Sequence, residues 1–381
     1  MIKLNTEQLK MLNDGIRDGL IKFQTSPCER YKIYNYTEKA QFGNDGWNEV
    51  TLMCRGLILD VDYNIIARPF TKFFNSTQPE VDNSQCVGDF TVYEKMDGSL
   101  VISTFYDGEL IVASRGSFES EQAIKAREII NEKYYDEIKE HDHITYCFEI
   151  IYPENRIVVD YGKTVDLVLI GAFNTKENID IRVEHILKPG FNVVKTYPIY
   201  SLEDIPKILE NKNNFEGFVI RFDSGYRVKM KSEEYKRLHR LVTGVSKKDI
   251  WEFMCTLEHD CNLEDIDGLS QRFICFYNHI PDKLYEFVKD SISEYVEIFF
   301  QKMNDACNTF CYVDRICTRK YQAKYIMDNV PELSGIIFRM LDIGEYGVKE
   351  NFNKYMKYVL KDLKPVGTEK FWNIKKSEDK G

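Results

Sequence analysis

The chain has 381 residues, of which 43% are hydrophobic, and this is enough material for two packed domains. Its charged residues (29%) are mixed in sign, and no run of about 18 apolar residues occurs, so the composition excludes a disordered chain and a membrane span. The net charge of −10 argues against a general coat for nucleic acids. Ten cysteines without a Cys-x-x-Cys pair predict free thiols in a cytoplasmic protein.

The first 243 residues predict an α+β domain. Residues 3–24 carry apolar side chains at helical spacing, and helices are also predicted at 120–135 and 202–210. Between residues 50 and 230, short apolar runs bounded by turn residues predict strands. The clearest of these runs are 56–61, 109–113, 144–150, 165–173 and 217–222.

Strand-like runs largely disappear after Tyr235, and helical spacing replaces them. The helices predicted there are 246–257, 281–302, 304–329, 331–342 and 350–363. The chain is therefore expected to contain an α+β domain at 1–243 and an all-helical domain at 244–381.

Residues 94–100, Glu-Lys-Met-Asp-Gly-Ser-Leu, are the most informative segment. An unprotonated lysine amine can attack phosphorus and hold a nucleotide covalently. The Asp-Gly-Ser turn lies between two apolar runs, 90–93 and 100–103, which places Lys95 at the end of a strand. Taken alone, the segment also fits a solvated lysine in a hairpin turn.

A nucleophilic lysine needs a depressed pKa, a carboxylate for a divalent metal, and cations for the phosphate oxygens. Glu149 lies inside an apolar strand, and Glu216 begins another. Lys229 and Lys231 are two residues apart, so a strand places them on one face. The segment 227–248 holds eight basic and two acidic residues, which suits either a phosphate ligand or a solvated helix face.

The order of these segments resembles the bacteriophage T4 RNA ligase 1 family. The matching segments are Arg55-Gly56, Lys72-Phe73-Phe74-Asn75, Lys95-x-Asp97-Gly98, Ser114-Arg115-Gly116-Ser117, Phe148-Glu149, Glu216-Gly217 and Lys229-x-Lys231. The resemblance extends from about 31–36 to 235–239. Arg115 is a departure, because the family often has lysine there, and arginine keeps the charge with a different geometry.

The resemblance implies an antiparallel-sheet nucleotidyltransferase (adenylation) domain at 1–243 and a helical domain at 244–381 that serves RNA or tRNA specificity. It implies an ATP-dependent RNA ligase that joins 5′-phosphate and 3′-hydroxyl ends through lysyl-AMP and adenylated RNA, in RNA or tRNA repair. The cofactors implied are ATP and Mg²⁺, with Mn²⁺ as a substitute, and the substrates include cleaved tRNA. We expect a monomer without membrane association, located in the cytoplasm (of the host cell if a phage encodes it).

The chemistry and the resemblance together predict the role of each site residue. Lys95 is the nucleophile, and Lys229 and Lys231 bind the α-phosphate and help to keep Lys95 neutral. Glu216 organises the metal, Glu149 binds the ribose, and Asp97 and Gly98 shape the loop. The other predicted ATP contacts are Tyr36, Arg55, Lys72, Phe74, Arg115, Val219 and Tyr235.

Two other readings share much of this pattern. A DNA ligase or capping enzyme uses the same lysine chemistry, but an OB-fold with short strands usually follows its last motif, and here the chain becomes helical. A catalytically inactive RNA-binding relative would have less need of the lysines. In the helical domain, Arg315, Arg319 and Lys320 lie near one helix face, which either contacts RNA or is simply solvated.

Overall fold

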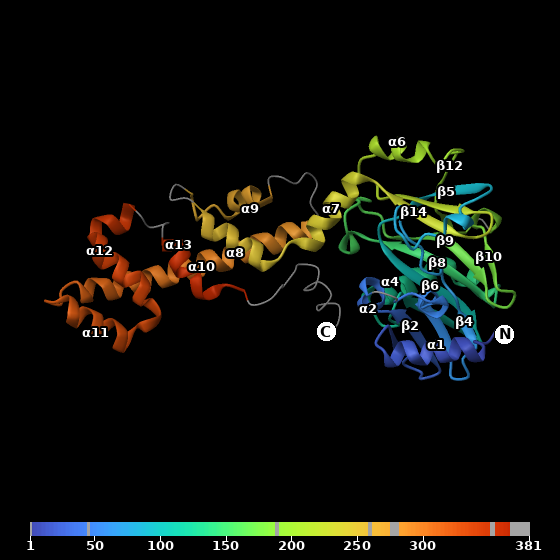
Figure 1. Ribbon diagram of the computed structural model, residues 1–381, viewed down its shortest axis with the longest axis horizontal. Helices are drawn as coiled ribbons and strands as arrows, with labels where there is room; N and C mark the ends of the chain where they lie inside the picture. The colour runs from blue at the N-terminus through green and yellow to red at the C-terminus, as the bar shows by residue number, and fades with distance from the viewer. Residues whose placement is uncertain are drawn as a thin grey trace. The chain divides into compact units, whose positions relative to one another are not determined.

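The computed structural model describes residues 2–43, 46–186, 190–257, 261–274, 282–350 and 355–365 (Figure 1). The chain forms two compact units, Met1–Arg237 and Leu238–Asp379, and the division falls within helix α7 (Glu233–Gly244). Within the described ranges, no helix is long and apolar enough to cross a membrane.

Three sheets build the first unit, and their strands are antiparallel apart from the short pair β9–β11. The first sheet, in spatial order, is β1 (Ile21–Thr25), β2 (Tyr31–Tyr36), β3 (Arg55–Asp60) and β4 (Ile65–Ala67). The second is β10 (Ile179–Ile181), β9 (Asp166–Asn174), β8 (Ile144–Ile151), β6 (Ser99–Tyr106) and β7 (Glu109–Ser114), with β11 (Asn192–Val193) beside β9. The third is β12 (Thr196–Tyr197), β5 (Phe90–Lys95), β13 (Gly217–Phe222) and β14 (Arg227–Lys231).

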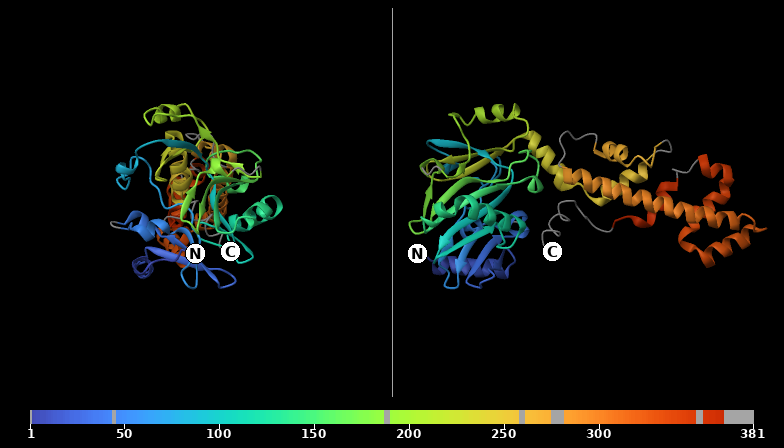
Figure 2. Two further views of the ribbon diagram at one scale, coloured as in Figure 1. Left: turned by 90° about the vertical axis from the view of Figure 1, so that its right-hand side faces the viewer. Right: turned by 180° about the vertical axis from the view of Figure 1, so that it is seen from behind.

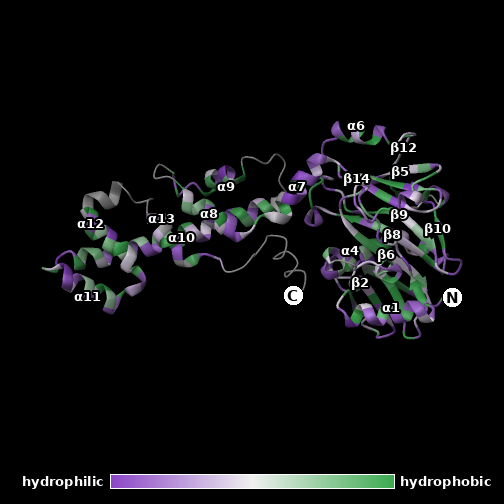
Figure 3. Ribbon diagram, viewed as in Figure 1, coloured by the Kyte–Doolittle hydropathy of each residue, from purple (hydrophilic) through white to green (hydrophobic). Residues whose placement is uncertain are grey.

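The strands of the first two sheets are buried along much of their length, and the apolar side chains on their facing sides pack together. Ile33 of β2 and Ile58 of β3 pack against Ile102 of β6 and Ala113 of β7, so a shared apolar core joins the first sheet to the second. In Figure 3 the central strands of this unit are coloured as largely hydrophobic, as expected for sheets buried on both faces. The α+β architecture with antiparallel sheets predicted for this part of the chain is confirmed.

The helices of the first unit cover the sheets. They are α1 (Thr6–Arg17), α2 (Glu38–Phe42), α3 (Glu49–Met53), α4 (Glu121–Ile129), α5 (Tyr135–Lys139) and α6 (Asp204–Glu210). The predicted helix 3–24 is too long, because α1 ends at Arg17 and residues 21–25 form β1. Gly19 adopts a left-handed backbone (φ 69°), which a helix interior does not accommodate and which glycine readily provides at a helix end.

The turn after Lys95 does not close a hairpin. β5 pairs with β13 and β12, whereas β6, which begins at Ser99, pairs with β7 and β8. Residues 96–98 therefore carry the chain from one sheet to another, and Lys95 lies where two sheets meet. The views in Figure 2 show the strands of these sheets from two further sides.

The described residues of the second unit are helical and contain no strand. The helices that follow α7 are α8 (Lys247–Thr256), α9 (Ile266–Ile274), α10 (Asp282–Val313), α11 (Arg319–Asn329), α12 (Ser334–Glu350) and α13 (Met356–Val359). The predicted break near residue 303 is wrong, because Met303 is fully buried within the 32-residue α10. The chain leaves the helix only after Val313, and α11 starts beyond Thr318.

Candidate active site

Three neighbouring strands bring Lys95, Glu216 and Lys231 together. The Cα atoms of Lys95 and Gly217 are partners across β5 and β13, and Gly217 is the partner of Lys231 across β13 and β14. Lys95 Nζ donates to Glu216 Oε2 at 2.8 Å, and Lys231 Nζ lies 2.9 Å from Glu216 Oε1. Glu216 is 3% exposed, so one buried carboxylate is shared between two amines.

The carboxylate of Asp97 anchors the loop that follows the nucleophile. Its Oδ2 accepts hydrogen bonds from the backbone N–H groups of Val158 and Val159, each at 2.8 Å, and its Oδ1 accepts one from the Tyr235 hydroxyl at 2.7 Å. The Asp97 N–H donates to the Tyr161 hydroxyl at 2.8 Å. These bonds hold the loop from both sides and leave Asp97 little freedom to reorient.

Gly98 allows the loop to approach β8 closely. A Cβ atom at this position would lie 2.4 Å from the carbonyl oxygen of Ile150 and 3.1 Å from Cγ of Glu149. The Gly98 N–H donates to Glu149 Oε1 at 3.2 Å. Burial raises the pKa of Glu149 to about 7 in spite of the nearby Lys95, so this carboxyl group is partly protonated at neutral pH and can both donate and accept hydrogen bonds.

The charge state of Lys95 differs from the prediction. Burial alone would lower the pKa of Lys95, but the carboxylates of Glu216, Glu149 and Asp97 outweigh burial and raise it. The prediction that Lys229 and Lys231 keep Lys95 neutral is therefore wrong for this arrangement. The reason is that an opposite charge in hydrogen-bond contact stabilises the ammonium more than the neighbouring amines destabilise it.

Lys229 has a strongly depressed pKa. Burial, reinforced by Lys72, Lys95, Lys231 and Arg55, lowers the pKa of Lys229 to about 6. Its backbone N–H donates to the carbonyl oxygen of Phe74 at 3.0 Å. Lys229 and Lys231 share one face of β14, as the spacing predicts, but only Lys231 is ion-paired with Glu216 among the described residues.

Lys72 lies among three aromatic rings. Its ammonium nitrogen is 5.2 Å from the ring centroid of Tyr36, 5.5 Å from that of Phe74 and 5.8 Å from that of Trp47, and it is 3.3 Å from the Tyr36 hydroxyl. The Lys72 N–H donates to the carbonyl oxygen of Leu52 in α3 at 2.8 Å. Attraction between the ammonium and the ring faces therefore fixes this amine in place without a carboxylate.

Arg115, whose side chain is exposed, lies beside the partly buried cations Lys72 and Arg55. Its guanidinium lies 5.6 Å from the Tyr36 ring centroid. Burial lowers the pKa values of Lys72 and Arg115. Neighbouring cations lower these pKa values further, whereas Tyr36 raises them. Burial would raise the pKa of the Tyr36 hydroxyl, but Lys72, Arg115 and Arg55 outweigh it and hold that pKa below its ordinary value. Clustered cations without a carboxylate partner favour a ligand that carries several negative charges.

A bulge at Gly56 directs Arg55 toward these cations. The register between β2 and β3 shifts so that Tyr34 faces Leu57 but Asn35 faces Arg55, and Gly56 is the extra residue. Gly56 has a φ of 101°, and a Cβ atom there would lie 2.2 Å from Cδ1 of Ile102. Without the bulge, Arg55 would share the face of Leu57, which packs against α1 and α3.

The remaining predicted residues lie around this cluster. Phe74 is buried, and its ring packs edge-on against Trp47 with centroids 5.5 Å apart. Val219 faces Lys229 across β13 and β14 and packs against the core beside Tyr93. Tyr235 donates its hydroxyl to Asp97, and its ring lies beneath Lys231 Nζ at 4.7 Å.

Two residues of the cluster were missed by sequence reasoning. Trp47 precedes the capping sequence of α3, and Asn35 lies within a strand whose other residues, apart from Lys32, are apolar or aromatic. No motif spacing marks either residue. A buried polar residue inside the run 31–36 is the one signal that could have drawn attention to Asn35.

For a metal, the site offers Glu216. Within the described residues, no group of three or more His, Cys, Asp or Glu side chains is arranged to hold an ion by itself. Mg²⁺ usually binds through one or two carboxylates together with substrate phosphates and water. The chemistry of a single buried carboxylate beside unpaired cations fits an ion that arrives with a polyphosphate.

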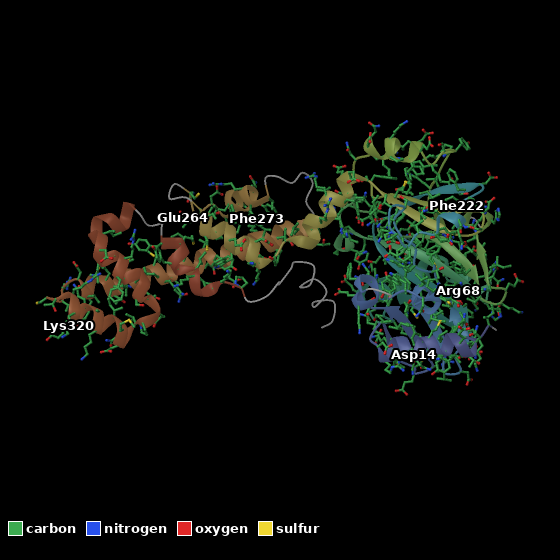
Figure 4. The ribbon with its side chains drawn as sticks, in the orientation of Figure 1. Asp14, Arg68, Phe222, Glu264, Phe273 and Lys320 are labelled. Carbon is green, nitrogen blue, oxygen red and sulfur yellow. The ribbon has the colours of Figure 1, made fainter. Side chains whose placement is uncertain are left out.

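Of the helical-domain cations, Arg319 is engaged within its own unit. Its Nη2 lies 2.6 Å from Oδ1 of Asp342 and also donates to the carbonyl oxygen of Phe338. Arg315 and Lys320 are exposed, and Lys320 is labelled in Figure 4.

Residues 53–235 match the model of a protein family described as RNA ligase, the T4 RNA ligase 1 type that the motifs resemble. A putative bifunctional polynucleotide kinase/RNA ligase of Autographa californica nuclear polyhedrosis virus is 27% identical over 270 residues, which cover 60% of this chain and 37% of the relative. A putative RNA ligase of Thermovibrio ammonificans is 27% identical over 193 residues, which cover 47% of this chain and 50% of the relative. The matches thus span half or less of the length of these two relatives.

Among solved structures, the chain is similar to a putative ATP-dependent DNA ligase from Aquifex aeolicus. The TM-score is 0.47 and the sequence identity 17%, and the similarity covers 78% of this chain and 81% of the other. A similarity at this level carries no argument about function.

Proposed function

We propose that this chain is an ATP-dependent RNA ligase that joins 5′-phosphate and 3′-hydroxyl ends, and the match of residues 53–235 to the RNA ligase family model supports the proposal. One observation carries the ATP dependence. A lysine paired with a buried carboxylate lies beside the partly buried Lys72 and Lys229 and the exposed Arg115, and none of these three basic side chains forms an ion pair with a carboxylate of the described residues. A nucleoside triphosphate supplies both the phosphorus for the lysine and the negative charge for the cations.

The reaction would proceed in three displacements at phosphorus. Lys95 Nζ attacks the α-phosphorus of ATP, so that an N–P bond forms and the bond to pyrophosphate breaks. An oxygen of an RNA 5′-phosphate then attacks the same phosphorus, and the lysine leaves. Finally, an RNA 3′-hydroxyl, which loses its proton, attacks the activated 5′-phosphate, and AMP leaves. Each step depends mainly on positioning and on charge neutralisation.

Lys95 must lose its proton before it can attack. The contact with Glu216, 2.8 Å away, is the main interaction that holds this proton on the amine. Any contact that draws the Glu216 carboxylate away therefore lowers the pKa of Lys95 toward the reactive range. A divalent metal bound with the triphosphate would supply Lewis acidity at the phosphate oxygens, and Glu216 is the residue that would hold it.

The other residues would bind the remaining parts of ATP. Lys229, with Lys72 and Arg115, would neutralise the phosphate oxygens, and the partly protonated Glu149 would hydrogen-bond to the ribose hydroxyls. The aromatic group of Tyr36, Trp47 and Phe74 would fix Lys72 in position. Tyr235 would act through Asp97, to which its hydroxyl donates.

We propose further that residues 1–243 form the adenylation domain and that the helical residues 244–381 recognise the RNA substrate, with cleaved tRNA as the candidate. The helical character of the second unit supports a specificity domain other than an OB-fold. A comparison of end joining on single-stranded RNA with sealing of a nicked DNA duplex tests the substrate class, and a preference for the DNA nick would contradict the assignment.

The central test is covalent labelling of Lys95. Purified protein incubated with ATP labelled at the α-phosphate and Mg²⁺ should acquire one AMP, which mass spectrometry should locate on Lys95. Lys95→Ala should abolish the label because the attacking amine is removed. Lys125→Ala, a change of an exposed lysine paired with Glu128 on α4, is the matched control and should label like the wild type. Equal labelling of Lys95→Ala and wild type would exclude the proposal.

A further inference from the structure

Asn35 and Arg55 are partners across β2 and β3, as a result of the Gly56 bulge. Asn35 is 4% exposed, and it lies on the same face of β2 as Ile33, which packs against the second sheet. Its Nδ2 is 3.5 Å from the position that a Cβ atom would take at Gly116, in the loop that carries Arg115. The pair therefore belongs to the wall of the cation cluster.

Each member of this pair has a buried polar atom without a partner. Among the described residues, no group donates to Asn35 Oδ1 and none accepts from Arg55 Nη1, although both atoms are buried. A buried polar atom without a hydrogen bond costs roughly 1–3 kcal/mol. Because the two residues are strand partners, one bound ligand can serve both atoms.

The two atoms have opposite requirements. Asn35 Oδ1 needs a hydrogen-bond donor, and Arg55 Nη1 needs an acceptor. A fully ionised phosphate offers only acceptors and would leave Asn35 unsatisfied. A hydroxyl group offers both in one atom. Arg55 also lies close enough to Glu149 to influence its pKa, which places the pair near the carboxyl group assigned to the ribose.

We propose that Asn35 and Arg55 bind a ribose hydroxyl of the nucleotide substrate, with the hydroxyl donating to Asn35 Oδ1 and accepting from Arg55 Nη1. Asn35 is then a specificity residue that distinguishes ribose from deoxyribose. This inference rests on the proposed ligase function. The ribose belongs either to ATP or to the 3′-terminal nucleotide of the RNA, since both present the same chemistry.

Asn35→Leu provides the test because it keeps the approximate shape and removes both polar atoms. In the ATP arm, lysyl-AMP formation by the full chain is measured with ATP, 2′-deoxy-ATP and 3′-deoxy-ATP. Wild type should prefer ATP over one deoxy analogue by roughly tenfold, as expected for one buried hydrogen bond. Asn35→Leu should lose this preference, because it slows lysyl-AMP formation with ATP and not with that analogue. Asn35→Asp keeps a hydrogen-bond acceptor and should retain the preference.

In the RNA arm, a pre-adenylated donor RNA removes the need for ATP, and the acceptor ends in either ribose or 2′-deoxyribose. Loss of discrimination in the ATP arm alone assigns the hydroxyl to ATP, and loss in the RNA arm alone assigns it to the acceptor RNA. Unchanged discrimination in both arms overturns the proposal. A change in selectivity for the 6-amino group of the base, measured with purine riboside triphosphate, would overturn it in favour of base contact.

Thermal unfolding separates ligand binding from a structural role. Asn35→Leu should leave the melting temperature of the protein unchanged or raise it, because the unsatisfied buried amide oxygen is removed. The matched control is Asn155→Leu, since Asn155 is also buried but accepts from Ser99 and donates to the carbonyl oxygen of Ile150. This control should lower the melting temperature by roughly 3–6 °C. A similar decrease in the melting temperature of Asn35→Leu would mean that Asn35 has a structural role. In that case the ATP and RNA measurements are repeated with Asn35→Ala, which has a smaller side chain. If wild type fails to form lysyl-AMP, the proposed function fails instead.

Discussion

The two ends of the β13–β14 hairpin treat their cations differently. Near Phe222, labelled in Figure 4, Arg221 Nε lies 3.0 Å and Arg227 Nη1 2.8 Å from Oδ2 of Asp180 on β10. Toward the other end, Lys229 is largely buried, and its charged neighbours are cations, which with burial lower its pKa to about 6. The same hairpin thus holds one cation group that the fold neutralises and one that it does not.

The presence or absence of a carboxylate partner distinguishes cations that stabilise the fold from cations that are suited to bind a ligand. Removing a cation from water is costly unless an anion compensates for the lost hydration. Asp180 provides that compensation for Arg221 and Arg227, so this end is complete without a ligand. Lys229 instead lowers the stability of the free protein, and a bound polyphosphate would restore the compensation. Burial alone does not distinguish the two groups; the presence of a carboxylate partner does.

The largest effect on stability is expected at the neutralised end. Asp180→Ala should lower the free energy of unfolding by about 3 kcal/mol, because two buried guanidinium groups lose their shared partner. Denaturant titration measures the change, and the folded fraction should still form lysyl-AMP. The control is Asp223→Ala, which removes an exposed partner of Arg182 and should cost less than about 1 kcal/mol. Equal costs for the two variants would mean that burial of the pair is unimportant.

At the unneutralised end, activity and not stability should suffer. Lys229→Met should slow lysyl-AMP formation by about 10²-fold, as is typical for loss of one group that stabilises developing charge. Its free energy of unfolding should be unchanged or higher, because at neutral pH the native state no longer keeps a lysine in its uncharged form. Lys125→Met serves as the exposed control. A large loss of stability in Lys229→Met would place this lysine with the structural cations.

Proton uptake should accompany nucleotide binding. The pKa of Lys229 is about 6 in the free protein, so this amine is mostly neutral between pH 7.5 and 8.5, and a triphosphate raises its pKa by favouring the charged form. Binding should then take up a proton, and affinity should strengthen by up to about tenfold as pH falls from 8.5 to 7.5. Calorimetry with a non-hydrolysable ATP analogue, in two buffers of different ionisation enthalpy, measures the uptake. Lys229→Met should reduce it, and undiminished uptake in that variant would assign the proton to another group.

The smallest effect is expected for the exposed pair of the helical unit. Asp342→Asn should change the free energy of unfolding by less than about 1 kcal/mol, because Arg319 and Asp342 are 48% and 60% exposed. The same pair limits how freely Arg319 could contact RNA. If Asp342→Asn strengthens RNA binding, measured by titration of labelled RNA, Arg319 is held back by this pair; unchanged binding would place it outside the RNA interface.

Local sequence determined much of the catalytic arrangement. Lys95 at a strand end, the loop residues Asp97 and Gly98, and the placement of Lys229 and Lys231 on one strand face all follow from short-range spacing, because strand periodicity and turn chemistry are local properties. The change from strands to helices after Tyr235 was also visible as a change in hydrophobic period.

Tertiary structure alone decided how these residues are charged and paired. Lys95 is protonated because Glu216, 121 residues away in sequence, lies 2.8 Å from its amine, whereas Lys229 loses its proton among Lys72, Arg55 and its neighbours. The side of the strand on which Arg55 lies depends on a one-residue bulge. The lack of a hydrogen-bond donor to Asn35 Oδ1 among the described residues depends on which side chains the fold brings near it. Spacing along a chain specifies the face of a strand on which a side chain lies. Electrostatics and hydrogen bonding depend on distances between strands, which only the folded chain establishes.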